Sequence, residues 1–394
     1  MTAPPKGKGK GKIVVFGILF FYPLAGVTYQ FLHYLIALRR LGYDPYYVED
    51  SARWIYDPRA NDMSPDVTGN IQMVLPALKA HGFTDRWCFR GKYEGGGCFG
   101  LGETQLEQLY REAEGFLNVT GAQEIRDEHR AIRRRIYVES DPFVAQIKVA
   151  QGDQGMIDLL AAHDTHFSFG ENLGTPDCSV PVGKFTWLPT RQPVVPELWT
   201  GAPSGGDTYN TITTWHNKGK DIDWQGDRWY WTKDREFEKF LALPQHRPGL
   251  RFELAATVGD DVRTRLLQHG WRQRDSIDIS RDTERYLRYI QQARAEFTVA
   301  RDQYVRPRTG WFSDRTVCYL AAGRPVITQE TGFSQNVPSG RGLFGFSTMD
   351  DVLRSIDQIE TDYSGHCRAA QEIAAEYFEA TKVVGSLMQR AGLG

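Results

Sequence analysis

The chain has 394 residues, of which 41% are hydrophobic and 24% are charged, and its formal net charge at pH 7 is −2. These values are typical of a globular protein long enough for two domains, and they argue against a disordered or fibrous chain. A charge so near zero gives no long-range attraction to nucleic acid or anionic lipid, so we expect no nucleic-acid partner.

The longest apolar run, Ile13–Tyr22, is about half the length that a bilayer span needs, so no transmembrane segment is expected. Five cysteines at irregular spacings form neither a disulfide framework nor a zinc pattern, which favours a reducing cytoplasm. The pair His163 and His166 has no Cys or Glu at ligand spacing, so neither a metal nor another cofactor is expected.

Residues 1–12 are predicted to be a disordered basic tail, with a polyanion-binding arm as the alternative. The continuous apolar run Lys12–Tyr22 predicts a buried strand of a parallel sheet. A turn follows, and then the pattern predicts a helix over Tyr29–Leu41 and a strand over Tyr46–Glu49. This βαβ unit predicts a doubly wound sheet, but its turn lacks the Gly-x-Gly-x-x-Gly spacing of a dinucleotide site.

Residues 13–192 are predicted to form one Rossmann-like domain. Its later strands are expected at Arg86–Phe89, Phe116–Val119, Arg135–Glu139 and Thr165–Phe169, with helices at Glu103–Glu114 and Gly155–Ala162. The glycine-dense interval Gly91–Gly102 is either a lid or acceptor loop, or a plain surface loop.

Pro and Gly reach linker density at residues 193–207, which predicts an interdomain linker there. Residues 208–368 are predicted to form a second Rossmann-like domain, and residues 369–390 a single long helix with an apolar face. The second domain is expected to contain strands at 209–215 and 252–257, and helices at 232–240, 260–269 and 282–294.

The most informative segment runs from Glu296 to Asn336. It reads as a strand, a glycine turn, a short helix, Gly323-Arg324-Pro325, a second strand and a polar loop. The helix begins at an N-cap pair and continues with a guanidinium and a hydroxyl, a combination that suits a pyrophosphate: Ser313, Asp314, Arg315 and Thr316. The alternative is an ordinary αβ turn of any doubly wound domain.

This layout resembles the nucleotide-sugar donor site of GT-B-fold glycosyltransferases. It departs from them where many carry two glutamates, since Gly310 and Cys318 stand at those positions. The resemblance implies two Rossmann-like α/β domains facing each other across a cleft, with residues 369–394 packing back on the first domain. It also implies a nucleotide-diphosphate sugar as the donor and a small-molecule or glycan acceptor.

The resemblance also suggests further donor-side residues. The basic loop with His216, Lys218 and Lys220 is expected to approach the diphosphate, the alternative being a basic surface turn. Asp221 and Asp223 have the spacing of a metal motif, which we attribute to chance. Trp271 is assigned either to stacking on the base or to the core. Polar residues after Pro325 suit sugar hydroxyls: Gln329, Glu330, Thr331, Gly332, Gln335 and Asn336.

The first domain is expected to supply the acceptor side of the site. Asp141, Glu171 and His166 follow or occupy strand ends and are candidate catalytic bases, in that order, although such acids are often caps or salt-bridge residues. Gly26, Tyr22 and Asn172 are placed on the acceptor side, within or near an aromatic-rich segment over Phe20–Tyr47 and a polar turn.

Three functions are compatible with these features. The first is metal-independent glycosyl transfer, by direct displacement or by front-face return. The second is a nucleotide-sugar 2-epimerase of the same fold, and the third is a non-catalytic protein that binds nucleotide sugars. The residue pattern leaves open the base, the sugar, the acceptor, the stereochemical outcome and the oligomeric state.

Overall fold

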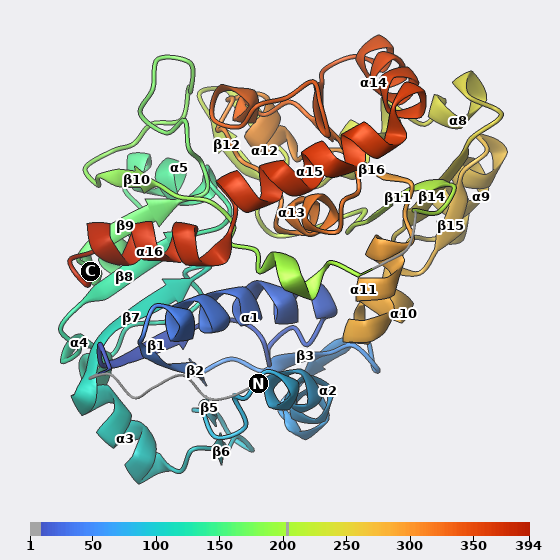
Figure 1. Cartoon of the computed structure of the whole chain (residues 1–394). Helices are drawn as coiled ribbons and strands as arrows, with labels where there is room; N and C mark the ends of the chain where they lie inside the picture. Colours follow the sequence, from blue (N-terminus) through green and yellow to red (C-terminus); the bar gives the residue numbers. More distant parts are fainter. Residues whose placement is uncertain (1–8, 202–204) are drawn as a thin grey trace.

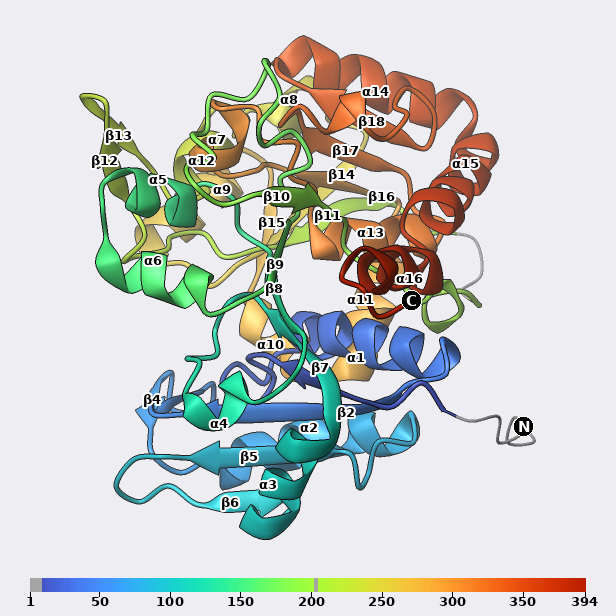
Figure 2. The same cartoon turned by 90° about the vertical axis from the view of Figure 1, so that its left-hand side faces the viewer.

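The structure, a computed structural model, describes residues 9–201 and 205–394 as two lobes, each built around a largely parallel sheet (Figures 1 and 2). The first sheet has eight strands in the order β10-β9-β8-β7-β1-β2-β5-β6, and only β6 is antiparallel to its neighbour. Its strands are β1 (Lys12–Phe16), β2 (Asp44–Ser51), β5 (Trp87–Gly91), β6 (Cys98–Gly100), β7 (Ala113–Val119), β8 (Arg135–Glu139), β9 (Thr165–Ser168) and β10 (Trp187–Pro189).

The helices of the first lobe cover both faces of this sheet, as expected for strands that are apolar on both sides. They are α1 (Ala25–Arg40), α2 (Thr68–Ala80), α3 (Glu103–Glu112), α4 (Asp127–Arg130), α5 (Val144–Ala150) and α6 (Gln154–Ala161). A small hairpin, β3 (Ile55–Asp57) and β4 (Asp62–Ser64), lies beside α2.

The second sheet is fully parallel, in the order β15-β14-β11-β16-β17-β18. Its strands are β11 (Thr208–Ile212), β14 (Arg251–Ala255), β15 (Arg272–Arg274), β16 (Ala295–Thr298), β17 (Val326–Gln329) and β18 (Leu343–Phe346). A separate hairpin, β12 (Ile222–Trp224) and β13 (Asp227–Trp229), extends from this lobe to pack against α5 of the first.

The second half of the chain is rich in short helices. They are α7 (Asp234–Glu238), α8 (Leu243–His246), α9 (Asp260–Gln268), α10 (Ser276–Ser280), α11 (Thr283–Gln291), α12 (Asp302–Val305), α13 (Asp314–Ala321), α14 (Met349–Thr361), α15 (Tyr363–Tyr377) and α16 (Ala380–Arg390), with single 3₁₀ turns at Pro196–Leu198 and Phe333–Gln335.

The first strand is shorter than predicted, because β1 ends at Phe16 rather than continuing to Tyr22. Gly17 packs so closely on the ring of Phe31 that a Cβ atom would lie 2.1 Å from it. Beyond this contact the backbone leaves the sheet, and the N–H groups of Phe20 and Phe21 donate to the Glu49 carboxylate. A side chain from β2 therefore satisfies the backbone that a longer strand would have satisfied through the sheet.

The predicted tail and linker lie partly outside the described residues, namely at 1–8 and 202–204. Lys10 N–H donates to the Gly42 carbonyl in the turn before β2, and Asp44 N–H in β2 donates to the Gly11 carbonyl, so the last residues of the predicted tail lie against the sheet. The first part of the linker is packed, because Val194, Val195 and Trp199 are fully buried.

The C-terminal segment is two helices, not the single long helix that was predicted. The helical run is interrupted at Phe378 and Glu379, because Val194 N–H donates to the Phe378 carbonyl and Ala380 N–H donates to the Val194 carbonyl. After this interruption α16 changes direction and packs against α1 of the first lobe (Figure 1).

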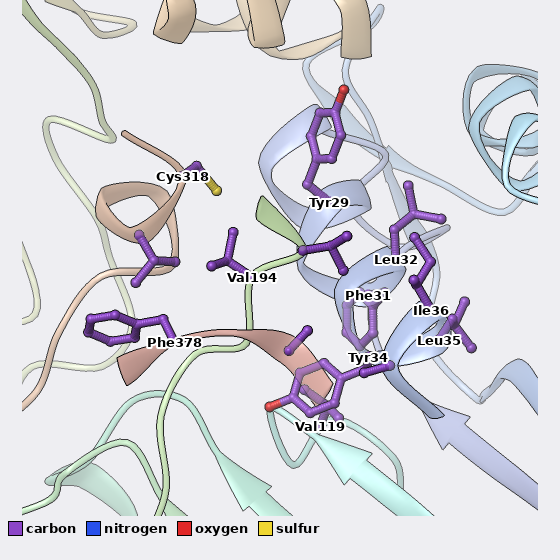
Figure 3. Close-up of a cluster of buried hydrophobic side chains, with 14 of the residues drawn as sticks. Tyr29, Phe31, Leu32, Tyr34, Leu35, Ile36, Val119, Val194, Cys318 and Phe378 are labelled. Carbon is purple, nitrogen blue, oxygen red and sulfur yellow. The ribbon is translucent and has the colours of Figure 1, made fainter. Parts of the chain in front are cut away.

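A continuous apolar core joins the two lobes. Figure 3 shows Val194 between the side chains of α1 on one side and Cys318 and Phe378 on the other. Trp199 belongs to the same core: its ring centroid is 4.6 Å from that of Tyr29, and its indole N–H donates to His33. None of the described helices is long and apolar enough to cross a membrane.

Trp199 is the largest fully buried side chain of this shared core. Trp199→Ala should lower the free energy of unfolding by about 3–5 kcal/mol, because it leaves a cavity between the lobes and an unpaired His33 nitrogen. Urea denaturation measures this effect. Trp54→Ala is the matched control, because Trp54 is 50% exposed; it should change stability by less than about 0.5 kcal/mol. Equal losses in the two variants would contradict the shared-core assignment.

Candidate functional site

The principal cleft lies between the lobes, where the carboxyl ends of strands from both sheets face each other. Its volume is about 1720 Å³. This is the location expected for ligands of open parallel sheets, because loops leave the strands there while the sheets hold those loops in place.

The first-lobe wall is built from loops that follow β1, β2, β7 and β8. Glu49, at the end of β2, is buried and holds the loop after β1 through its bonds to Phe20 and Phe21. Burial raises the pKa of Glu49 to about 8, although the hydrogen bonds it accepts act in the opposite direction. Tyr22 and Tyr56 lie at this wall with their ring centroids 5.6 Å apart.

Asp50 forms a second buried network in the same wall. Arg90 and Arg126 pair with its carboxylate, and His129 Nε2 lies 3.2 Å from it. Asp50, Glu128 and His129 have ligand atoms within 4.8 Å of one another, a spacing that suits a metal ion. The two guanidinium groups already neutralise this carboxylate, so the donor set fits an ion-pair network better than a metal site.

The second-lobe wall combines the loop after β11 with the start of α13. Thr213, Thr214 and residues 216–222 contribute from the loop, and Ser313–Arg315 with Cys318 contribute from the helix. Hydroxyl groups extend this wall beyond β14 and along α10, at Thr257, Ser276 and Ser280. Helix α13 therefore presents its N-terminus to the cleft, as the sequence predicted for this segment.

Asp141, the leading candidate base, is engaged by the opposite lobe. Its carboxylate accepts a hydrogen bond from Arg301 at 2.9 Å and another from the Tyr304 hydroxyl, and Lys220 Nζ lies 3.8 Å away. Burial alone would raise the pKa of Asp141, but Arg301, Lys220 and these hydrogen bonds hold it below its usual value. Asp141 is therefore an ionised carboxylate within an interlobe ion pair, an environment that weakens it as a base.

Arg315 reaches the cleft but its guanidinium is already bonded within the second lobe. Its three nitrogens donate to the Glu296 carboxylate at 2.6 Å, the Ile212 carbonyl at 2.7 Å and the Thr298 hydroxyl at 2.7 Å. Glu296 is fully buried, so this pair neutralises a charge that would otherwise be costly. Little of the positive charge of Arg315 remains for a ligand.

Lys233 is a cleft residue that the sequence reasoning missed. Its side chain lines the cleft, the residue is only 8% exposed, and among the described residues it has no hydrogen-bond or ion-pair partner. Burial, followed by Arg315 and Arg301, lowers the pKa of Lys233 well below its usual value. The only signal in the sequence was its place between Trp231-Thr232 and an acidic helix start, which is also common on surfaces.

Nine of the predicted site residues line this cleft, and the others do not. Those that do are Tyr22, Gly26, Asp141, His216, Lys218, Lys220, Ser313, Asp314 and Arg315. His216 pairs with Asp234 at 2.9 Å, and Lys220 lies over the ring of Trp231 at 4.2 Å from its centroid. The basic loop is thus partly held by its own lobe.

Two candidate bases lie away from the cleft. His166 is buried within the first lobe, where its Nε2 lies 2.8 Å from the Leu160 carbonyl. Burial lowers the pKa of His166, which favours the neutral ring of a core histidine. Glu171 instead forms a 2.7 Å ion pair with Arg191. His166 lies within β9 and faces the interior of the first lobe, and Glu171 lies in the turn after β9 and faces Arg191; the sequence alone fixes neither side-chain direction.

Trp271 belongs to the core of the second lobe and cannot stack on a base in this structure. It is 2% exposed, its indole N–H donates to the Leu241 carbonyl, and its ring lies 5.0 Å from that of Phe237. Thr316 is likewise fully buried. Of the two interpretations offered for Trp271, the core interpretation is the one that the structure shows.

The polar loop after β17 joins the lobes instead of facing the cleft. Asn172 donates to the carbonyls of Arg308 and Gly332 and accepts from Asn336, and Gln335 donates to Asp177. Three further residues of the loop bond within the second lobe. Gln329 bonds to Ala300 and Glu236. Glu330 accepts from Gly332 N–H, and Thr331 donates to the Trp311 carbonyl. The Asn336 and Gln335 amides therefore bond to first-lobe side chains, and the Asn172 amide bonds to second-lobe backbone.

Two other sequence features have structural explanations. Asp221 accepts from Trp231 N–H and Asp223 pairs with Arg228, so both acids stabilise the β12–β13 hairpin. The glycine-dense interval Gly91–Gly102 contains β6, which lies at the edge of the first sheet. No residue of that interval lines the cleft, among the residues that the structure describes.

The raised pKa of the buried Glu139 carboxyl group can be tested through the pH dependence of stability. It is buried at the end of β8, accepts from Ser168 and Gln146, and burial raises its pKa to about 8 from 4.5. Between these pH values the unfolded chain loses the proton that the folded chain keeps, so stability falls as pH rises. Glu139→Gln should therefore narrow the difference in melting temperature between pH 5 and pH 8. Exposed Glu107→Gln should leave it unchanged, and an unchanged difference in Glu139→Gln would contradict the assignment.

No protein-family model matches the sequence, and no curated protein matches it. Solved structures do match its fold. An alpha-glucosyltransferase in complex with UDP superposes with a TM-score of 0.61 at 8% identity, covering 97% of this chain and all of that one. HepE from Anabaena, in complex with UDP and glucose, gives 0.56 at 11% identity, covering 97% and 99%. AviGT4, a glycosyltransferase involved in avilamycin A biosynthesis, gives 0.55 at 11% identity, covering 97% of each chain.

One of these likenesses corrects an expectation drawn from net charge. The alpha-glucosyltransferase was also solved with UDP and a 13-mer DNA, and that structure superposes with a TM-score of 0.63 at 9% identity over 98% of this chain. The exclusion of nucleic acid as a partner is therefore wrong, since a fold of this kind accommodates DNA. At these identities the likeness establishes architecture: two Rossmann-like lobes around a cleft, in the GT-B arrangement.

Proposed function

We propose that the protein is a glycosyltransferase that moves a sugar from a nucleoside-diphosphate sugar to an acceptor bound in the interlobe cleft. The observation that carries this proposal is Lys233, a buried lysine in the cleft of a GT-B fold. Its ammonium group has no hydrogen-bond or ion-pair partner among the described residues and lies 6.0 Å from the centroid of the Trp311 ring. A buried ammonium group is costly unless an anion balances it, so its position favours an anionic ligand.

The surroundings of Lys233 support a diphosphate as that anion. Arg301 also lines the cleft, and its Nε is buried without a hydrogen-bond partner. The N-terminus of α13 contributes partial positive charge and free N–H groups, and Lys218 lies on the facing loop. Together these groups stabilise the charge that develops on a leaving diphosphate.

The nucleoside is assigned to the hydroxyl-bearing part of the second-lobe wall. Thr257, Ser276 and Ser280 offer donors and acceptors to a base or ribose, and Tyr286 closes the wall behind them. This assignment replaces the one made for Trp271. Cys318 lines the cleft where related enzymes carry a glutamate, so ribose recognition has to come from these hydroxyls or from backbone.

The acceptor is assigned to the first-lobe wall. Tyr22 and Tyr56 line it, and Tyr22 is 37% exposed. Exposed rings at a cleft mouth stack on sugar or base rings, and they favour transfer over 2-epimerisation, which needs no acceptor. An acceptor screen should include small molecules, glycans and duplex DNA.

Binding experiments test the donor assignment. Thermal-shift measurements with UDP, GDP, dTDP and ADP should show stabilisation by at least one nucleotide, and UDP is the first probe because it was bound in the glucosyltransferase and HepE structures. Lys233→Met should weaken that binding about 10- to 100-fold, as expected for a lost charge-assisted bond to phosphate.

Lys239→Met is the matched control for Lys233→Met. Lys233 directly precedes α7 and Lys239 directly follows it. The Lys239 side chain is 59% exposed and pairs with Glu236 away from the cleft. Nucleotide affinity should be unchanged in that variant. Removing a buried unpaired cation is not expected to unfold the protein, so equal nucleotide affinity in wild type and Lys233→Met would refute the diphosphate site.

We further propose that transfer needs no metal, since Lys233, Arg301 and the start of α13 supply positive charge at the diphosphate. Turnover of the donor should therefore be the same in EDTA as in its absence, as followed by release of the nucleoside diphosphate. Loss of turnover that manganese or magnesium restores would instead assign a metal to the cleft.

A cytoplasmic location is proposed as well, because all five cysteines are free thiols.

A further inference from the structure

Asp314 differs from the other carboxyl groups of the cleft. It is the first residue of α13 and is partly buried. Among the described residues its side chain has no ion-pair partner and no hydrogen-bond partner from another residue, since its carboxyl group is bonded only to its own backbone N–H. The other buried or partly buried acids of the cleft all have one: Glu49, Asp50, Glu139, Asp141, Asp153 and Asp221.

The charges around Asp314 do not compensate for this lack of a partner. Arg315, its neighbour on α13, is committed to Glu296, and Asp141 faces it from the first lobe as a second negative charge. The remaining titratable groups around it are the Tyr34 and Tyr286 hydroxyls and the Cys318 thiol, from α1, α11 and α13. Burial and then Asp141 raise the pKa of Asp314 to about 7.

A diphosphate at the N-terminus of α13 would add negative charge next to this carboxyl. An ionised Asp314 would repel it at short range in a site of low dielectric, whereas a neutral carboxylic acid can donate a hydrogen bond to a phosphate oxygen. The protonated form of Asp314 is therefore the one that is compatible with the ligand, while Lys233 and Arg301 lie in the same cleft and can attract the diphosphate.

We propose that Asp314 binds the donor diphosphate as a neutral carboxylic acid and so couples donor binding to the uptake of one proton. This inference rests on the proposed function, because it takes a nucleoside diphosphate as the ligand of the cleft. It makes Asp314 a donor-site residue whose protonation state decides affinity, in addition to the cations that supply attraction.

The direction of the pH dependence follows from linkage. The bound state holds the proton more tightly than the free state, so affinity is highest below about pH 7 and falls as pH rises above it. With a free-state pKa of about 7, the Kd for UDP should rise roughly 10- to 20-fold between pH 7.0 and 8.5 through this group. The phosphates of UDP titrate near pH 6 and do not contribute over this range.

Isothermal titration calorimetry with UDP at pH 7.0, 7.5, 8.0 and 8.5, each in two buffers of different ionisation enthalpy, measures both affinity and proton uptake. Wild type should take up at least about one proton per UDP at pH 8. Asp314→Asn keeps the shape and a donor group, and should reduce the uptake by about one proton and flatten the rise in Kd. Asp153→Asn is the control: Asp153 caps α6 at the cleft rim, asparagine also caps, and its pH profile should match wild type.

The possible results separate this inference from the donor assignment. Lys233 also titrates in the cleft, so proton uptake that persists in full in Asp314→Asn but is lost in Lys233→Met would overturn the role of Asp314. Absence of proton uptake by the wild-type protein at pH 8 would also overturn the role of Asp314. That measurement needs no variant, so a folding defect cannot explain its result. Binding of none of the four nucleoside diphosphates would overturn the proposed function and this inference together.

Discussion

The ion pair between Asp141 and Arg301 is the contact on which the geometry of the cleft depends. It joins the loop after β8 to the loop after β16, so the two sheets meet at a fixed point on the cleft floor. Trp231 and Tyr304 support the guanidinium, with ring centroids 3.6 and 5.6 Å away. The Asp141 and Arg301 side chains are 32% and 16% exposed, so each charge is partly removed from water and is paired across the lobes. Neither lobe therefore forms this floor alone.

The rest of the site follows from the balance of charge around this pair. Asp141 compensates Arg301, and Glu296 compensates Arg315, which leaves Lys233 as surplus positive charge and Asp314 as an acid without a cation. A site with this inventory is incomplete by itself. It becomes balanced when a ligand contributes negative charge to the ammonium group and an acceptor atom to the carboxylic acid.

The sequence was sufficient for the α/β class, the order of most strands along the chain and the N-terminus of α13, because these depend on local periodicity and capping. It was insufficient where long-range contacts override local preference. Glu49 ends β1 early by bonding to Phe20 and Phe21, and Val194 divides the C-terminal helix. The positions of the domain boundaries stay predictions.

Side-chain direction limited the site predictions in the same way. Asp141, Lys218 and Lys220, in the loops after β8 and β11, reach the cleft. His166, within β9, and Glu171, in the turn after it, face elsewhere. A sequence also cannot tell a buried lysine from an exposed one. Lys233 is recognisable only when Trp231, Arg301 and Arg315 are seen to converge on the same wall.

The chain passes between the lobes twice, and the two passages are bonded to each other. Val194 belongs to the first passage and Phe378 to Ala380 belong to the second, with hydrogen bonds in both directions between them. Two bonded passages resist sliding and twisting of the lobes more than a single passage would. The lobes are also held together at Asp141, Asn172 and the β12–β13 hairpin, and by the apolar core in which α1 contacts α11 and α13. The cleft is therefore enclosed by lobes that are joined on more than one side.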